Sequence, residues 1–262
     1  MTEFSREQLL TMLRAPDPVQ RDDVAYIAMV QRVASGAEDP GLTALGDDMA
    51  SRLTDPEIQA RTFAALILGE IVDRDRVTGA AGEPAVARWR DAYAAWYPAE
   101  TDLRGYDERL GWLHAVAHGA DVLAAFGRSP RMGREDLRGL LDVAAARLVA
   151  SARYVLRDQE DDRLGYALAQ LLARAELDEA DSTEWLGRIA AALRTATAGP
   201  VPPFASNAMR TLRALYLLCD RGFLPPEATQ GESGAAVLTV AHPEALKTAL
   251  GGVLSLAWPY LA

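Results

Sequence analysis

The sequence predicts an all-α protein of about ten helices. Apolar residues recur at intervals of three and four along almost the whole chain, and no segment sustains the alternating pattern of a β-strand. Turn and cap signals divide this pattern into segments of helical length with short connections. We therefore expect a HEAT-like αα-superhelix or a compact multi-helix globule, and we favour the superhelix.

Proline and N-cap residues mark the helices of the N-terminal part. Asp17-Pro18 and Asp55-Pro56 each place a capping side chain before a proline, which is how many helices start. We expect these helices to run to about residues 35 and 72, with shorter helices over 3–14 and 42–53. The two Asp-Pro pairs lie roughly forty residues apart, near the period of HEAT repeats, and they indicate a weak repeat.

The rest of the chain continues in the same helical pattern. A helix rich in aromatic residues starts at Pro84 and ends at Pro98, and Gly222 ends a helix over residues 204–221. Other helices are expected over residues 107–126, 134–156, 160–177, 182–197 and 243–258. We interpret residues 1–262 as one all-helical domain, with N-terminal helix pairs in 1–83, a motif-bearing part in 84–222, and a C-terminal loop and helix in 223–262.

Composition and charge argue against several classes of protein. A formal net charge of −10 and a pI near 4.9 disfavour nucleic acid as a partner, because phosphate binding needs a basic surface. No run approaches the ~20 apolar residues of a membrane span, and no secretory signal is visible. The single cysteine, Cys219, excludes an internal disulfide and fits a reducing cytoplasm. Alanine is abundant and every basic residue except Lys247 is arginine, which suggests a bacterium with a GC-rich genome.

Two of the three histidines lie four residues apart in the most informative stretch of the chain. If residues 107–126 are helical, His114, His118 and Asp121 share one face within about 60° of each other. Their neighbours are mostly apolar, so this polar stripe should lie inside the protein or along a cleft. Three readings stay open: a structural pair, a metal-free acid/base or ligand site, and a metal site formed by all three residues. An H-E-x-x-H metalloprotease is disfavoured, since Ala115 stands at the glutamate position.

A polar loop leads into this stretch. Its two carboxylates and its arginine could hold a metal or clamp a polar ligand. Loop capping, with Asp102 paired with Arg104, is the alternative. Because the loop adjoins the polar stripe, we predict that it contacts a ligand through Glu100, Asp102, Arg104, Tyr106 and Trp112.

A second polar group follows later in the chain. Asn207, Arg210 and Arg213 recur every three residues on an otherwise apolar helix. They could form a structural ion-pair network or a pocket for an anion or carboxylate, and we predict ligand contacts from Asn207 and Arg210. The acidic turn at residues 158–163 lacks the glycine and terminal glutamate of a calcium loop, so we interpret it as helix capping. The chain has no nucleotide-cofactor motif, and a divalent metal is the cofactor left open.

These motifs resemble those of an uncharacterised bacterial family, domain of unknown function 2785. The resemblance covers most of residues 93–217 and implies an all-helical protein without an assigned activity. It rests on Glu100-x-Asp102-x-Arg104-Gly105-Tyr106, Gly111-Trp112-x-His114-Ala115-x-Ala117-His118-Gly119-Ala120-Asp121, Glu160-Asp161-Asp162-Arg163-Leu164, Asn207-x-x-Arg210 and Leu215-Tyr216.

We expect a cytoplasmic protein whose polar site binds a small polar ligand or metal and carries out acid/base chemistry. His114 and His118 would transfer protons or bind the ligand, and Asp121 would orient His118. The alternative is a non-catalytic HEAT-like scaffold that binds a protein or peptide in its groove, with the stripe only fixing helix packing. A HEAT-repeat glycosylase acting on nucleic acid is a third reading, and the acidic charge counts against it. The sequence does not indicate the ligand or the oligomeric state.

Overall fold

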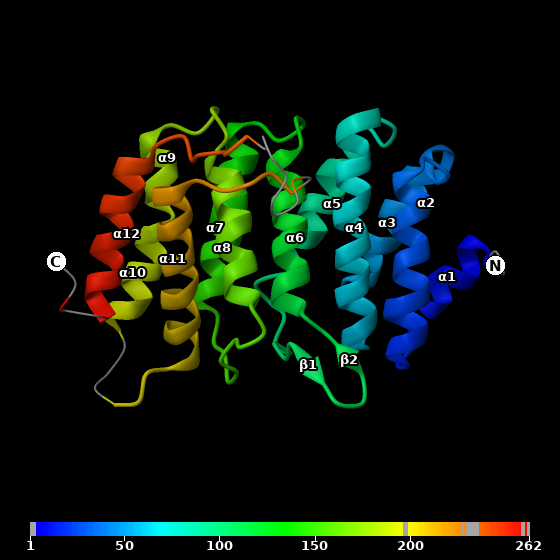
Figure 1. Ribbon diagram of the computed structural model, residues 1–262, viewed down its shortest axis with the longest axis horizontal. Helices are drawn as coiled ribbons and strands as arrows, with labels where there is room; N and C mark the ends of the chain where they lie inside the picture. Colours follow the sequence, from blue (N-terminus) through cyan, green and yellow to red (C-terminus); the bar gives the residue numbers. More distant parts are fainter. Residues whose placement is uncertain (1–3, 196–198, 227, 229–235, 258–259, 261–262) are drawn as a thin grey trace. The chain divides into compact units, whose positions relative to one another are not determined.

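The computed structural model confirms the all-α fold class (Figure 1). It describes residues 4–195, 199–226, 228, 236–257 and 260. The elements are, in chain order, α1 (Arg6–Met12), the π-helix η1 (Val19–Tyr26), α2 (Ile27–Ala34), the 3-10 helix η2 (Asp39–Gly41), α3 (Leu42–Arg52), α4 (Ile58–Thr78), α5 (Glu83–Trp96), β1 (Tyr106–Asp107), β2 (Gly111–Trp112), α6 (Ala115–Arg128), α7 (Arg134–Val149), α8 (Glu160–Leu172), α9 (Glu179–Glu184), α10 (Leu186–Arg194), α11 (Pro203–Arg221) and α12 (Pro243–Ala257).

The chain packs as two compact units. Met1–Arg131 with Leu156–Glu160 forms the first unit, and Met132–Val155 with Asp161–Ala262 forms the second. The single domain in three parts and the HEAT-like pairing of helices stay predictions.

Helix α4 lies at the centre of the first unit. Most of its side chains are buried, because apolar and small residues surround it on all sides, and it packs against α2, α3, α5 and α6. The contact with α6 is close: a Cβ added at Gly69 would stand 3.7 Å from the Cα of Val122. This packing holds the start of α6 beside the start of α4.

Aromatic residues of α5 and the turn after it fix α6 from another side. Tyr93 and Tyr97 stack with ring centroids 5.2 Å apart, and both side chains are fully buried. Their hydroxyls donate to α6, Tyr93 to the carbonyl of Gly119 at 3.0 Å and Tyr97 to that of Val116 at 2.8 Å. These two bonds fix the position of the first turns of α6.

In the second unit, α7 and α10–α12 form the core. Helix α7 packs against α10 and α11, and α12 packs against α9, α10 and α11. Helix α8 comes close to α11 at Gly165, where an added Cβ would stand 3.0 Å from the Cβ of Ala214. Trp185 is buried between α9 and α10 and donates to the carbonyl of Ser182.

The expected helix over residues 107–126 is wrong at its start. Helix α6 begins only at Ala115, and β1 and β2 form a short antiparallel hairpin before it, with Tyr106 opposite Trp112. Gly111 and His114 both have positive φ, 71° and 45°, which a right-handed helix does not allow. The N–H groups of Leu113 and His114 donate to the carbonyl of Gly105 instead of entering a helix.

Other helix boundaries differ by less. The segment after Pro18 begins as the π-helix η1 before α2 continues it. Residues 182–197 are expected as one helix; α9 and α10 are found up to Arg194, and residues 196 and 197 lie outside the described residues. Helices α7 and α8 end at Val149 and Leu172, before the expected 156 and 177.

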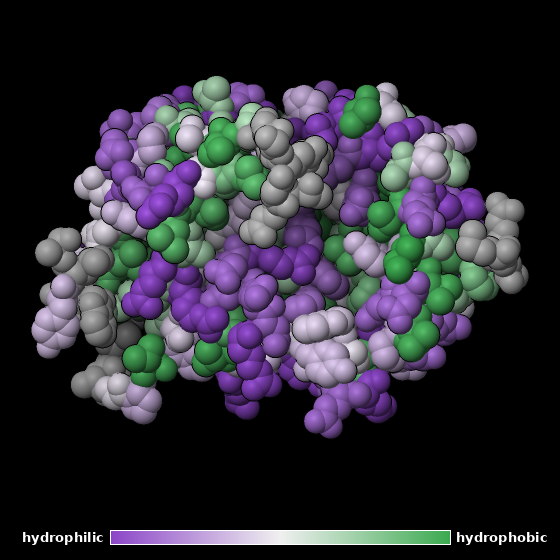
Figure 2. All heavy atoms as spheres, viewed as in Figure 1, coloured by the Kyte–Doolittle hydropathy of each residue, from purple (hydrophilic) through white to green (hydrophobic). Residues whose placement is uncertain are grey.

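Figure 2 shows one face of the molecule, on which hydrophobic residues are scattered among hydrophilic ones. Among the described helices, none combines the length and the apolar character needed to cross a membrane.

Candidate functional site

The hairpin before α6 is held by a buried arginine of η1. Arg21 is 0% exposed, and its guanidinium donates to the carbonyls of Leu110 at 2.5 Å and Trp112 at 3.3 Å. Its Nε lies 2.7 Å from the Asp22 carboxylate, and its guanidinium lies over the ring of Phe63 at 4.7 Å. Arg21 therefore connects η1, α4 and β2 in one polar cluster.

His114 immediately precedes α6 and has a left-handed backbone conformation, with φ 45° and ψ 40°. Its imidazole stacks on the indole of Trp112, with ring centroids 4.4 Å apart and planes inclined by 4°. Nδ1 of His114 lies 3.5 Å from Oε1 of Glu160, at the outer limit of a hydrogen bond. Neither atom has another hydrogen-bond partner among the described residues.

Glu160 is the first residue of α8 and is 1% exposed. Burial raises the pKa of Glu160, but hydrogen bonds from His114 and from the backbone N–H groups of Glu160 and Asp158 outweigh it, so the pKa lies below its ordinary value. The carboxylate is therefore ionised at neutral pH. Gly105 allows this close approach, because a Cβ there would lie 2.3 Å from Oε1 of Glu160.

His118 lies one turn into α6 and is buried. Its Nδ1 is 3.1 Å from the carbonyl oxygen of Thr62, so this nitrogen carries the proton in the neutral ring. Its ring packs edge-on against Phe63 at 5.3 Å and lies 5.7 Å from the His114 ring. The two histidines are neighbours, but His114 stands outside the helix rather than on a helical stripe.

Asp121 lies beside α4. Burial raises the pKa of Glu70 on α4, and the charges of Asp73 and Asp121 raise it further. Within the described part of the chain, no group of three or more His, Cys, Asp and Glu side chains could hold a metal ion. The metal site at His114, His118 and Asp121 receives no support from the geometry.

The polar loop before the hairpin is held by its own ion pairs. Glu100 is 7% exposed and accepts from Arg61 at 2.8 and 3.1 Å and from the Trp96 indole at 3.0 Å. Burial raises the pKa of Glu100, but these hydrogen bonds and one from the N–H of Asp102 lower it by more, so the pKa lies below its ordinary value. The geometry indicates a structural role for Glu100, which ties α4, α5 and the loop together.

Asp102 and Arg104 form the pair that the loop-capping alternative expects. The Arg104 guanidinium makes two bonds to Asp102, at 2.9 and 2.6 Å, and one to Asp107 at 2.6 Å. The hydrogen bonds from Arg104 lower the pKa of Asp102. The Arg104 side chain is 41% exposed, so a polar ligand can still reach it.

Tyr106 and Trp112 lie side by side on the hairpin. Their rings meet edge to face with centroids 5.0 Å apart, and they are 48% and 45% exposed. Large exposed aromatic rings next to a histidine offer a surface on which a planar or apolar part of a ligand can stack.

Asn207 and Arg210 lie on α11 in the second unit. The Asn207 amide donates to the carbonyl of Tyr154 at 3.0 Å, and Arg210 Nε lies 2.5 Å from the Asp161 carboxylate. Burial raises the pKa of Asp161 by more than the charge of Arg210 lowers it, so the pKa lies above its ordinary value. These contacts match the structural-network reading of this helix.

Sequence reasoning missed three residues of the first unit's site. Arg21 belongs to no motif, and nothing in the sequence distinguishes it from the many other arginines. Gly105 shows its role only through its close approach to residue 160, and Glu160 was interpreted as part of a helix-capping turn. The signal for Glu160 lay in the chain, since it starts the Glu160-Asp161-Asp162-Arg163 motif, but its partner His114 is distant in sequence.

The fold and this site define an all-α protein in which a partly exposed histidine faces a buried glutamate beside an exposed aromatic hairpin. The family described as "Protein of unknown function (DUF2785)" matches residues 48–217, which is more than half of the chain, and the chain belongs to this family. A search among curated proteins found no match. The matched segment contains His114 and Glu160, and Arg21 lies outside it.

Proposed function

We propose that the protein binds a small polar ligand at the hairpin and transfers a proton to or from it through His114. One observation supports this most: His114 is stacked on exposed Trp112 and its Nδ1 faces the buried, ionised Glu160 at 3.5 Å. A carboxylate at Nδ1 sets the tautomer and stabilises the imidazolium, which leaves Nε2 for proton exchange. Glu160 is the positioning residue and His114 the proton-transfer residue.

Backbone strain at the pair supports the proposal. His114 and Gln159 are the two residues other than glycine with positive φ in the described chain, and Gln159 directly precedes Glu160. Such conformations cost on the order of 1–3 kcal/mol each and occur often at active sites and ligand-binding sites. The backbone therefore carries this conformational cost at His114 itself and at Gln159, the residue that positions Glu160.

The ligand would contact the exposed groups around His114. Tyr106 and Trp112 supply ring faces, and Arg104 with Asp102 supplies charge on the adjoining loop. The His118 ring lies 5.7 Å from the His114 ring, and its Nδ1 is hydrogen-bonded to the carbonyl of Thr62. A ligand with a planar or apolar part, a polar group, and a carbon-bound proton made acidic by that group fits this arrangement.

The test uses the small number of histidines. With only His114, His118 and His242 present, histidine Cε1–H signals are resolved in a labelled protein, and the Trp112 indole N–H reports on the hairpin. Pools of sugar phosphates, amino acids, dicarboxylates and nucleosides are added, and compounds that shift both signals are incubated in D₂O. We expect one class to bind and to exchange a carbon-bound proton for deuterium, with a rate about 10²–10⁴-fold lower in His114→Gln.

Matched variants separate catalysis from folding. Glu160→Gln should lower the deuterium-uptake rate while binding is kept, and His242→Gln, in the second unit, should change neither. If no compound shifts the His114 and Trp112 signals, or if His114→Gln and wild type exchange equally fast, the proposal is wrong. Under the scaffold alternative, His114→Ala/His118→Ala would lower the melting temperature with no binding phenotype.

A further inference from the structure

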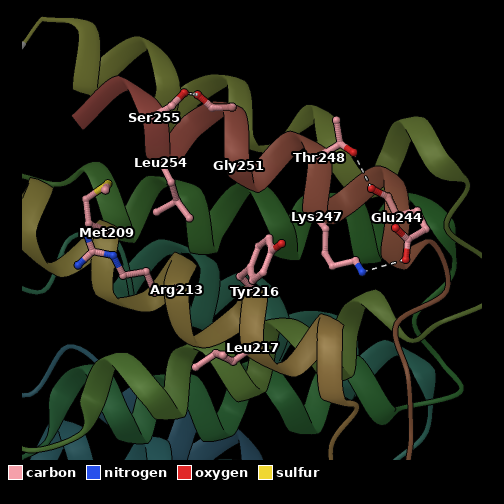
Figure 3. Close-up of a pocket in the computed structure, with 11 residues that line it drawn as sticks. Met209, Arg213, Tyr216, Leu217, Glu244, Lys247, Thr248, Gly251, Leu254 and Ser255 are labelled. Atoms are coloured by element: carbon pink, nitrogen blue, oxygen red, sulfur yellow. Dashed lines mark hydrogen bonds and ion pairs between the residues drawn. The ribbon is translucent and has the colours of Figure 1, made fainter. Parts of the chain in front are cut away.

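The second unit contains a groove between α11 and α12 that is separate from the hairpin site (Figure 3). Its volume is about 770 Å³. Met209, Arg213 and Tyr216 line it from α11, and Lys247, Gly251 and Leu254 line it from α12. The spacing of these residues is helical, so each helix presents one continuous stripe to the groove.

The two ends of the groove differ in charge. Figure 3 shows Arg213 beside Met209 at one end and Lys247 with Glu244 toward the other. The charge of Lys247 is neutralised by two ion pairs, since its Nζ lies 2.9 Å from the carboxylate of Glu244 and 3.5 Å from that of Asp220. No described residue forms a hydrogen bond or ion pair with Arg213, which leaves one cationic end without a counter-charge.

The middle of the groove is apolar. Leu254 and the Tyr216 ring lie between the two ends, and Leu217 on the rim is 61% exposed. Gly251 and Gly252 widen the groove, because a Cβ added at either would meet no atom within 4 Å. A groove with an apolar middle that ends at an arginine without a counter-charge is complementary to a hydrocarbon chain with a terminal anion.

From this arrangement we infer that the α11–α12 groove binds an aliphatic carboxylate, with the carboxylate at Arg213 and the chain along Tyr216 and Leu254. The anion pocket expected on this helix is thereby assigned to Arg213, because Asn207 and Arg210 are bound to Tyr154 and Asp161.

The size of the groove favours a small ligand over a protein partner. Its volume lies within the ~300–1,000 Å³ typical of small-molecule sites. Among the described residues eleven line it, whereas a stable protein interface takes roughly 20–30 residues on each side.

The test measures binding of decanoate to the full chain by calorimetry, with acetate and 1-decanol as probes that lack the chain or the charge. Arg213→Ala should weaken decanoate binding about tenfold, since it removes one charge-assisted interaction. Arg188→Ala is the matched control, because Arg188 is an exposed arginine on α10 outside the groove. Its decanoate affinity should equal that of wild type, and 1-decanol should bind wild type and Arg213→Ala alike.

A second variant pair tests the channel itself. Gly251→Leu places a side chain in the groove and should abolish decanoate binding without loss of the fold. Gly139→Leu is the control, because a Cβ at Gly139 on α7 also meets no atom within 4 Å. Absence of decanoate binding to wild type, equal binding by acetate, or unchanged affinity in either Arg213→Ala or Gly251→Leu would overturn the inference.

Discussion

Arg21 is the residue on which the hairpin depends most, and its replacement gives the sharpest test of the site's architecture. Arg21→Met keeps an apolar stem over Phe63 but removes the guanidinium. Three carbonyls lose a charged donor, those of Ala15 at 3.0 Å, Leu110 at 2.5 Å and Trp112 at 3.3 Å. Asp22 loses its ion-pair partner at 2.7 Å.

The magnitude follows from burial. Breaking a fully buried ion pair by removing one partner costs about 3–5 kcal/mol. Arg21 is buried, but the Asp22 side chain is 19% exposed and can be hydrated, so its stranded charge contributes less than this. Each orphaned carbonyl alone would add about 1–3 kcal/mol, but these costs overlap and the hairpin can rehydrate, so we expect about 3–5 kcal/mol in total. Asp22→Asn in the Arg21→Met background should recover part of the loss, because it removes the stranded charge.

Urea unfolding measures the loss in free energy, and hydrogen exchange of the Leu113 amide, which donates to Gly105, reports on the hairpin itself. Arg14→Met is the control, since Arg14 is 50% exposed and its pair with Asp55 is worth about 0–1 kcal/mol. A loss for Arg21→Met below about 1 kcal/mol, or no larger than that of Arg14→Met, would refute the role of Arg21 as the anchor.

Two further predictions concern the packing around the site. Gly119→Ala should lower the free energy of unfolding by about 1–3 kcal/mol, because its Cβ would lie 2.0 Å from Cε2 of buried Tyr97. Gly139→Ala is the control: a Cβ there meets open space, so this variant should raise the free energy of unfolding by up to about 1 kcal/mol. Equal effects of the two variants in chemical denaturation would contradict this reading. The pKa of Glu100 in the folded protein lies below its ordinary value of 4.5. Its pairing with Arg61 therefore stabilises the fold fully above pH 4.5, and this stabilisation is lost as the pH falls below 4.5 and through the lower pKa of the folded state. Glu100→Gln should therefore cost about 1–3 kcal/mol at pH 7 and progressively less below pH 4.5; a constant difference across a pH series of melting curves would show that the charge of Glu100 is not involved.

Much of the fold was predictable because helices are encoded locally. The interval of three and four between apolar residues places α4, α5 and α11 near their observed positions. Helix α4 nevertheless continues to Thr78, past the expected end near residue 72, and Gly79 ends it with φ 69°. The carboxylates of the polar loop were also found, since Asp102 and Arg104 are two residues apart and pair as the spacing suggests. In each case the deciding interaction spans only a few residues.

Tertiary structure decided what the sequence could not. Residues 107–114 look helical by their apolar pattern, yet Arg21 binds the carbonyls of Leu110 and Trp112 from a distant element, and that contact favours a hairpin. His114 gains its partner Glu160 only when the chain brings the start of α8 to the start of α6, and Gly105 makes room for it. The helical periodicity of the sequence therefore determined where most helices form, whereas contacts between residues far apart in the chain determined which polar side chains meet, because such contacts depend on packing that no local pattern records.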